Sequence, residues 1–364
     1  MINIISIKED HTMYDVLRTI SEGVDYDINI LGLDSPGGID HPIYLNPKNF
    51  ELPFLLYLEE PSTFDGITRE EGFERPPTVA KWDAQSMSWS LKSTYRYPVP
   101  LEVLSLFLDN KNFMGFVSHL KDTCRIIFTK YKTNCYHLPL SSSKKNLNLI
   151  KQRIASLNED RPINLYTSSS WGDTTGGNFF NRGGRIIDEL AIRLLDDNTN
   201  IKLTYRTPLA MKNCLASYPT NMDLITEYLS RDKLEELMSR QDIYLLPSRQ
   251  VHSVSLTEAF SYGMPSVVST GWGISEFCVD GFNSLMHSIE DFNWSDKKEN
   301  GDWVPEKYLN NIIPRIKNLC EDRELLIKKS ENILAWYDAN HSRENHRNNF
   351  TNLMDHIVRQ HGGD

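Results

Sequence analysis

The sequence predicts two doubly wound α/β domains, each built on a parallel sheet. Short β-branched or apolar runs alternate with helical patterns in two successive blocks of the 364-residue chain. A polar, charged segment at 141–162 separates the blocks, and only helices follow the last strand. Hydrophobic residues make up 40% of the chain and charged residues 24%, a composition that can bury a core in each domain.

The first block opens with a strand–helix–strand pattern. The run INIISI at 2–7 is followed by a helical pattern at 13–23 and then by DINILGL at 27–33. A β-α-β start of this kind predicts parallel strands. Further strands are expected at 53–60, 78–83, 112–118 and 134–140, and a helix at 120–131.

The second block repeats the alternation and ends in helices. Strands are expected at 163–168, 201–206, 222–228, 242–248 and 265–270, and helices at 182–195, 231–241, 255–263, 304–319, 321–337 and 342–360. The predicted domains are therefore 1–150 and 151–340, followed by a C-terminal helix at 341–364. Doubly wound sheets bind ligands outside the carboxyl ends of their strands, so we expect a site where the two domains face each other.

The charge balance and the cysteines argue against some classes of protein. A formal net charge of −10 disfavours a protein that wraps duplex nucleic acid, because such binding uses Lys and Arg to neutralise phosphates. The five cysteines are odd in number and lack CxxC spacing, so we expect reduced thiols. The N-terminus does not resemble a signal peptide and no apolar run could span a bilayer. A cytoplasmic protein is expected, with peripheral membrane contact left open.

The segment PSRQVHSVSLTEAFSYGMPSVVST at 247–270 has the pattern of a binding site. A strand delivers the chain to a polar turn, and Ser253 or Ser255 can cap the helix that follows. The N–H groups at such a helix start attract a phosphate. Glu258 lies about one turn further on, where a carboxylate suits the two hydroxyl donors of a ribose. On spacing alone, Glu258 could equally be a solvated acid in an ordinary β-α-β unit.

A glycine-rich loop further upstream leads into another helix. GGNFFNRGGRIIDEL at 176–190 places Arg182 and Arg185 at a helix start, beside Gly183. Glycines permit a close approach of the backbone, and arginines offer bidentate contacts to phosphate. The spacing is neither that of a P-loop nor a clean GxGxxG, so a mobile loop before a solvated helix start is the alternative.

The stretch from 242 to 287 resembles the donor-site signature of the retaining GT-B glycosyltransferases of family 4. In that family a strand ending in Pro-Ser runs into Glu-x7-Glu, then an alanine, a glycine and Pro-Val-Val, and later Glu-Phe-Val and Asp-Gly-x-Asn. The matching residues here are Pro247, Ser248, Glu258, Ala259, Gly263, Pro265, Val267, Val268, Gly273, Glu276, Phe277, Asp280, Gly281 and Asn283. The resemblance is close over 160–290, vague over 110–143 and slight before that.

The resemblance implies a GT-B fold, with two Rossmann-like domains facing a cleft and a C-terminal helix that crosses back to the N-terminal domain. It implies transfer of a sugar, with retention, from a nucleotide-diphosphate-sugar to an acceptor, without a metal or another cofactor. Arg182 would clamp the diphosphate, Tyr228 would hold the base and Glu258 the ribose. The donor-binding residues that it implies are Arg182, Gly183, Arg185, Tyr228, Ser248, Gln250, Val251, His252, Ser253, Val254, Ser255 and Glu258. The donor base and sugar, the acceptor and the oligomeric state stay open.

Three departures from the family pattern affect what can be carried over. The first acid of Glu-x7-Glu falls on Gln250, which keeps an acceptor, adds a donor and can change the choice of sugar. The family arginine just before the lysine has no clear counterpart, and Arg185 is a possible substitute. KEDHTMYD at 8–15 replaces the glycine-rich first loop.

The residues with a candidate catalytic role are Arg182, Gln250, Asp83 and His252. His252 could exchange a proton because imidazole titrates near neutrality, although in the family this segment mainly supplies backbone contacts. Residues 81–83, Lys-Trp-Asp, fall where the family keeps a sugar-contacting histidine. Core packing for Trp82 and a helix cap at Asp83 are the alternatives. His119 and His137 are weaker candidates.

Three rival functions stay open. A metal-dependent GT-A glycosyltransferase would use Asp25-Tyr26-Asp27 as a DxD metal site, but these residues come at the entrance to a strand rather than at its carboxyl end. A non-catalytic sugar- or nucleotide-binding protein would explain Gln250 and the missing arginine. An enzyme that glycosylates modified bases in DNA has no motif here and conflicts with the charge balance.

Overall fold

The structure, a computed structural model, divides into two compact units. Unit 1 comprises residues 1–75, 95–143 and 339–364, and unit 2 comprises residues 76–94 and 144–338. The residues that the structure describes are 2–5, 21, 25–31, 51–58, 79–83, 88–92, 105, 107–141, 146–168, 183–195, 200–207, 221–248, 251, 253–271, 273–291 and 305–361.

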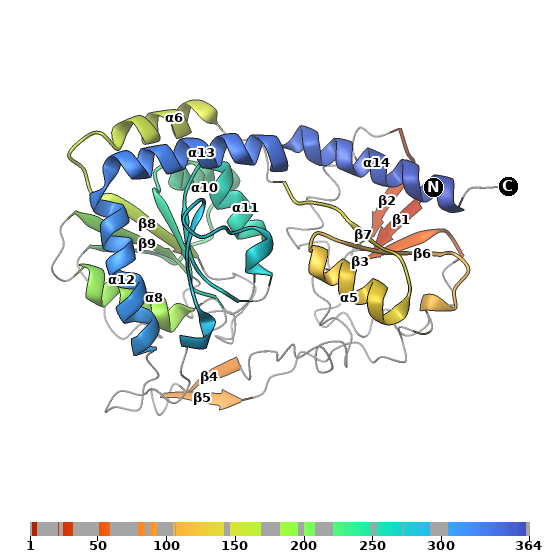
Figure 1. The fold of residues 1–364 in the computed structure, drawn as a ribbon, viewed down its shortest axis with the longest axis horizontal. Coiled ribbons are helices and arrows are strands. Elements are labelled where there is room, and N and C mark those ends of the chain that lie inside the picture. Colours follow the sequence, from red (N-terminus) through yellow and green to blue (C-terminus); the bar gives the residue numbers. More distant parts are fainter. Residues whose placement is uncertain are drawn as a thin grey trace. The chain divides into compact units, whose positions relative to one another are not determined.

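Unit 1 is built on a five-stranded parallel sheet with the order β2-β1-β3-β6-β7 (Figure 1). Its strands are β1 (Ile2–Ile5), β2 (Ile28–Leu31), β3 (Phe54–Tyr57), β6 (Phe113–Ser118) and β7 (Cys135–His137). Helix α5 (Lys121–Tyr131) connects β6 to β7, because parallel neighbours need a crossover. Every residue of β3 is buried, as a central strand covered on both faces requires.

The C-terminal helix α14 (Arg343–His361) packs on the strands of unit 1 (Figure 1). The Tyr26 hydroxyl, just before β2, donates a hydrogen bond to Asp355. The Tyr136 hydroxyl, in β7, donates one to Oε1 of Gln360 at 3.0 Å. The predicted return of the C-terminal helix to the N-terminal domain is therefore confirmed. None of the helices in the described part of the chain is both long and apolar enough to cross a bilayer.

Unit 2 is built on a six-stranded parallel sheet with the order β10-β9-β8-β11-β12-β13 (Figure 1). Its strands are β8 (Ile163–Ser168), β9 (Ile201–Arg206), β10 (Met222–Ile225), β11 (Ile243–Leu246), β12 (Ser266–Ser269) and β13 (Ser284–His287). In chain order this is 3-2-1-4-5-6, the arrangement of dinucleotide-binding folds. The strand order reverses between β8 and β11, which makes this the switch point of the sheet.

Helices and short 3-10 turns cover the unit 2 sheet. They are α6 (Leu147–Ser156), α8 (Gly184–Leu195), α10 (Arg231–Met238), α11 (Ser253–Ser261), η3 (Ile274–Glu276), η4 (Ile289–Asp291), α12 (Glu306–Glu321) and most of α13 (Arg323–His341). In the described part of the chain, α8, α11 and η3 lie in the parallel connections from β8 to β9, from β11 to β12 and from β12 to β13.

The two faces of the unit 2 sheet differ in chemistry. Leu165, Leu203 and Leu245 pack with α8 and α12 in one apolar core. Side chains alternate along a strand, so Tyr166 and Tyr244 lie on the opposite face. These two tyrosines occupy matched positions on β8 and β11, and their ring centroids are 5.9 Å apart. Both are buried, so this face of the sheet carries buried phenol groups.

Two differences from the sequence-based predictions concern residues 76–94. The strand expected at 78–83 does not join the unit 1 sheet, because β4 (Val79–Asp83) pairs antiparallel with β5 (Ser88–Lys92). Residues 76–94 also group with unit 2, whereas the prediction included them in the N-terminal domain. An antiparallel pair needs no crossover, so two short strands close in the sequence can pair their backbone hydrogen-bonding groups with each other.

Two cysteines that the sequence separates lie side by side in unit 1. The Sγ atoms of Cys124 in α5 and Cys135 in β7 are 3.4 Å apart, and both thiols are half-buried and free. Cys278 and Cys320 are buried free thiols of unit 2, and burial raises the pKa of each to about 12. These two thiols are therefore protonated at neutral pH.

A buried carboxylate stabilises the amino end of β11. Asp242 is fully buried and accepts two hydrogen bonds from the Arg161 guanidinium, at 2.7 and 2.9 Å. The backbone N–H of Asn164 donates a third at 2.9 Å. Arg153 of α6 lies 3.6 Å from the same carboxylate, and burial lowers the pKa of its guanidinium to about 10. The network joins α6 to the first residues of β8 and β11.

We expect Asp242→Asn to lower the free energy of unfolding by about 3–5 kcal/mol, because two guanidinium groups lose their buried counter-charge. Urea unfolding followed by tryptophan fluorescence measures the loss. Glu236→Gln is the matched control, since Glu236 pairs with Arg240 on the exposed side of α10. Exposed pairs contribute about 0–1 kcal/mol, so equal losses in the two variants would contradict the assignment.

Candidate functional site

The candidate site lies at the carboxyl edge of the unit 2 sheet, between β8 and β11. Strand order reverses there, which leaves a crevice that loops and helix starts can line. Helix α11 begins at Ser253, shortly after β11 ends at Leu246. Helix α8 follows β8 in the chain and begins at Gly184.

The start of α8 lies directly against the end of β11. A Cβ atom on Gly183 would lie 2.2 Å from the carbonyl oxygen of Pro247 and 2.8 Å from its Cγ. The φ angle of Gly183 is 80°, in the left-handed region that favours glycine. Glycine is therefore required at this position on two grounds. The contact brings the Gly-Gly helix start and the Pro-Ser strand end, separate motifs in the sequence, to one place.

The turn after β11 is held by buried hydrogen bonds. The backbone N–H of Ser248 donates to the carbonyl oxygen of Leu246 at 2.7 Å. The carbonyl oxygen of Ser248 accepts a hydrogen bond from the Ser269 hydroxyl, at the end of β12. Ser248 is fully buried, and Val251 is buried as well. The neighbouring strand therefore fixes the backbone that leads toward α11.

Helix α11 presents an N-terminus without acidic side chains. It begins at Ser253, so Ser253 and Ser255 are its first and third residues rather than the cap that the sequence predicts. Ser253 is buried, and its carbonyl oxygen accepts a hydrogen bond from the Thr257 hydroxyl at 2.7 Å. The first turn contains no acid, and the same is true of α8. First-turn N–H groups lack acceptors within the helix and carry partial positive charge, so both helix starts favour an anion.

Glu258 lies further along α11 and faces the start of α10. Its Oε1 atom lies 3.5 Å from Nη2 of Arg231, the first residue of α10. The Glu258 side chain is 20% exposed and the Arg231 side chain 53% exposed, so solvent screens this ion pair and it contributes little to stability. The carboxylate is thus held close to α10, in a pair weak enough for a ligand to displace.

Buried tyrosines adjoin Glu258. Burial raises the pKa of Tyr166 to about 12, with Arg206 opposing the shift and Glu258 adding to it. Burial also raises the pKa of Tyr262, and Glu258 and Glu235 add to that shift. Both phenols are therefore uncharged at neutral pH. The acidic side chain that lies near them on α11 is that of Glu258.

Sequence reasoning missed two cations near this edge. Arg206 is the last residue of β9, and Arg231 is the first residue of α10. The position of Arg206 at the end of an expected strand was a signal that could have identified it, because carboxyl ends of parallel strands meet at one edge. Arg231 approaches Glu258 only when α10 and α11 pack together, so no local pattern encodes that pair.

Several predicted donor residues lie outside the described residues. These are Arg182, Gln250 and His252, together with the side chain of Arg185. Tyr228 follows β10 and has 78% of its surface exposed. Val254 and Ser255 are half-buried in the first turn of α11. The roles of all these residues stay predictions.

Asp83 and His119, candidates from the N-terminal part of the chain, lie in different units. Asp83 ends β4 in the antiparallel pair with β5, and its side chain lies outside the described part. Its expected position at the end of a strand of the N-terminal parallel sheet is therefore wrong. His119 is buried in unit 1, where its Nδ1 atom is hydrogen-bonded to the Tyr57 hydroxyl.

The acidic pair considered as a metal site lies at the amino edge of the unit 1 sheet. Asp25 and Asp27 are exposed and directly precede β2. The backbone N–H of Ile2 donates to the carbonyl oxygen of Asp27 at 2.8 Å. Among the residues that the structure describes, no three or more His, Cys, Asp or Glu side chains come together to hold a metal ion. Independence from a metal stays a prediction.

Comparison with known proteins finds similarity in structure rather than in sequence. No family model and no curated protein matches the sequence. WaaG, a glycosyltransferase involved in lipopolysaccharide biosynthesis, is 13% identical with a TM-score of 0.58, over 97% of this chain and 99% of its own. HepE from Anabaena, solved with UDP and glucose, is 11% identical with a TM-score of 0.58, over 97% of this chain and 99% of its own. A UDP-forming α,α-trehalose-phosphate synthase from Burkholderia vietnamiensis is 9% identical with a TM-score of 0.55, over 100% and 99%.

At these identities the likeness establishes the fold. The matched structures span almost the whole of this chain, and both of its large sheets are parallel with doubly wound strand orders. The predicted fold class is confirmed: the chain adopts the GT-B fold of glycosyltransferases, with two Rossmann-like domains.

Proposed function

We propose that the protein is a glycosyltransferase that takes its sugar from a nucleoside-diphosphate-sugar and transfers it with retention. The observation that carries the proposal is the contact of Gly183 with Pro247 at the switch point of the unit 2 sheet. It sets the start of α8 beside the strand end that leads into α11, with Glu258 further along that helix. The likeness to HepE, which was solved with UDP and glucose, supports the same ligand class.

The diphosphate would bind at the two helix starts. Neither first turn carries an acid, so no carboxylate in that turn neutralises the partial positive charge at the start of either helix. Arg182, just before Gly183 in the sequence, would add a full positive charge. Arg185 would be a second cation at the same helix start. When the sugar leaves, negative charge develops on the diphosphate, and preorganised donors stabilise that charge more than the ground state.

Glu258 would bind the ribose. Its carboxylate offers acceptors to the two ribose hydroxyls, and the weak ion pair with Arg231 can yield to them. The released Arg231 would remain near the nucleotide, at the start of the helix that follows Tyr228. Tyr228 is exposed enough to stack on a base.

The transferred sugar would lie against the turn between β11 and α11. Gln250 and His252 belong to this turn in the sequence, and the buried Ser248 and Val251 flank them. Glutamine donates as well as accepts, so it can bind a different pattern of sugar hydroxyls from that of a glutamate. The positive groups at the diphosphate would stand in place of a metal ion.

A second candidate function is binding of the nucleotide-sugar without transfer. The presence of Gln250, where the resembled family has an acid, is the observation that favours it. The two functions share the donor site and differ only in turnover, so the same experiment separates them.

Thermal-shift measurements with UDP-, GDP-, ADP- and dTDP-sugars test the donor site. We expect one base to stabilise the protein, since a ligand at about 100 times its Kd adds about 2.7 kcal/mol. NMR of the stabilising donor should then show slow hydrolysis with retention at the anomeric carbon, and turnover should persist in EDTA. Stabilisation by none of the four would contradict the proposal. Stabilisation without turnover would favour the second candidate, and loss of turnover in EDTA would contradict metal independence.

Gly183→Ala should weaken nucleotide binding by about tenfold or more, because the added methyl group displaces the α8 start from Pro247. Gly281→Ala is the matched control. Gly281 also has a positive φ, of 77°, but an added Cβ meets no atom within 4 Å. Both variants should lose about 1–2 kcal/mol from the left-handed backbone. Titration calorimetry with the stabilising nucleotide measures the difference, and equal affinities in the two variants would argue against the site.

Glu258→Ala should raise the donor KM and the nucleotide Kd by about 10–100-fold, since hydrogen bonds to a charged acceptor contribute about 1.5–3 kcal/mol. Glu236→Ala, on the exposed side of α10, should leave both constants unchanged. The 2′-deoxyribose form of the same nucleotide should bind the wild type more weakly and lose less affinity in Glu258→Ala than the ribose form, because it keeps only one of the two hydroxyls. An unchanged donor affinity in Glu258→Ala would remove Glu258 from the ribose.

A further inference from the structure

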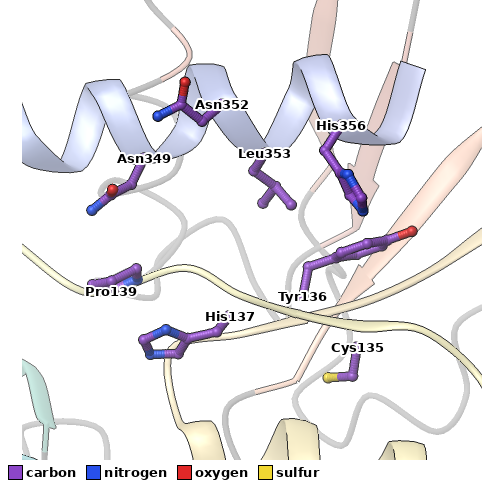
Figure 2. A pocket seen from close by; sticks show the side chains of 8 residues that line it. All are labelled: Cys135, Tyr136, His137, Pro139, Asn349, Asn352, Leu353 and His356. Carbon is purple, nitrogen blue, oxygen red and sulfur yellow. The ribbon is translucent and has the colours of Figure 1, made fainter. Parts of the chain in front are cut away.

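Unit 1 contains a second concave site, separate from the unit 2 switch point. A cavity of about 460 Å³ lies between β7, with the residues just after it, and helix α14. Figure 2 shows side chains of α14 on one side of this cavity and side chains of β7 on the other. It adjoins His137, the last residue of β7, and so reaches the carboxyl edge of the sheet, where doubly wound sheets bind ligands.

Among the residues that the structure describes, the lining of this cavity contains polar side chains but no Asp, Glu, Lys or Arg. Asn349, Asn352 and His356 follow one another at helical spacing along α14 and contribute two amides and an imidazole. Tyr136 and His137 contribute a phenol ring and a second imidazole from β7. Amides and imidazoles each supply hydrogen-bond donors and acceptors, so the surface is rich in hydrogen-bonding groups without a formal acid or fixed base.

The two walls are held together by contacts between β7, the residues just after it, and α14. The Tyr136 hydroxyl donates to Gln360 of α14 at 3.0 Å, and the rings of Tyr136 and His356 meet edge to face with centroids 5.9 Å apart. At the other end of the helix, the Ser141 hydroxyl is hydrogen-bonded to Nδ1 of His346 at 2.8 Å. The site is thus formed before a ligand enters, which lowers the entropy cost of binding.

The imidazole of His137 brings no charge into this cavity. Burial, with a smaller effect from Lys121, lowers the pKa of His137 to about 4, so this imidazole is neutral at pH 7. Among the described lining side chains, a phosphate or carboxylate would meet no guanidinium or ammonium group, and a cation would meet no carboxylate. Anions are usually bound by Arg or Lys, so the described part of the lining favours an uncharged ligand over an anion.

We propose that this cavity binds a neutral saccharide unit, the sugar part of the acceptor. A side-chain amide can donate to one hydroxyl and accept from its neighbour, and an aromatic ring packs on the apolar face of a pyranose. The volume lies within the range of small-ligand sites, about 300–1,000 Å³. The assignment as an acceptor site rests on the proposed function, whereas saccharide binding itself does not.

Saturation-transfer NMR with the full-length protein tests saccharide binding. The probes are maltose, cellobiose and lactose, with glucose 1-phosphate as a charged comparison. We expect at least one neutral disaccharide to bind, with an affinity unchanged between 50 and 500 mM NaCl, because no charge pairs are screened. Lack of binding by all three disaccharides, or stronger binding of glucose 1-phosphate, would overturn the inference.

Matched variants on α14 locate the binding. Asn349→Ala combined with Asn352→Ala should lower the affinity for the disaccharide about tenfold or more, because two hydrogen-bonding amides are lost. Asn348→Ala is the control, because Asn348 is an exposed amide of the same helix that does not line the cavity. Thermal midpoints of all variants show whether folding is retained. Equal affinities in the double variant and the control would overturn the site.

The outcome for the donor site is read separately, by nucleotide binding to the same variants. Saccharide binding that is lost in the double variant while nucleotide binding persists would support both assignments. Disaccharide binding without any nucleotide binding would keep the cavity and remove its role as an acceptor site. Nucleotide binding without disaccharide binding would leave the proposed function and overturn only this inference.

Discussion

The close approach of Gly183 to Pro247 is the constraint on which the rest of the candidate site depends. The backbone at the start of α8 occupies space that any side chain would fill, against the carbonyl group that ends β11. Because β11 sits beside β8 at the reversal of strand order, the contact fixes one helix start at the switch point of the sheet. The chemistry proposed for the site, a diphosphate held by helix ends, requires such proximity of backbone groups.

The two faces of the unit 2 sheet explain how that crevice is supported. One face is closed by leucines against α8 and α12, so the sheet cannot shift without opening an apolar core. The amino end of β11 is tied to α6 through the buried Asp242 carboxylate. The carboxyl end of the same strand is tied to β12 through Ser248 and Ser269. Strand β11 is therefore held at both of its ends.

Unit 1 shows a different kind of site, built from uncharged polar groups. Its cavity is made by a strand and a helix far apart in the sequence, β7 and α14, which the Tyr136–Gln360 hydrogen bond brings together. Unit 2 offers helix ends, arginines and a carboxylate, suited to a charged nucleotide. The difference in lining chemistry matches the two substrates of a sugar transfer: a charged donor and an acceptor whose sugar part is neutral.

The sequence by itself determined the alternation of strands and helices, the parallel sheets and the position of Glu258 beyond a helix start, because these depend on local periodicity and on ordered motifs. It did not show β5 or β13, whose short runs carry no clear period, and it placed Asp83 in the wrong sheet. Tertiary structure alone decided that Gly183 meets Pro247, that Arg231 pairs with Glu258 and that β7 and α14 line one open cavity. Contacts of this kind join residues far apart in the chain. They depend on how helices and strands pack together, and local sequence patterns do not predict that packing.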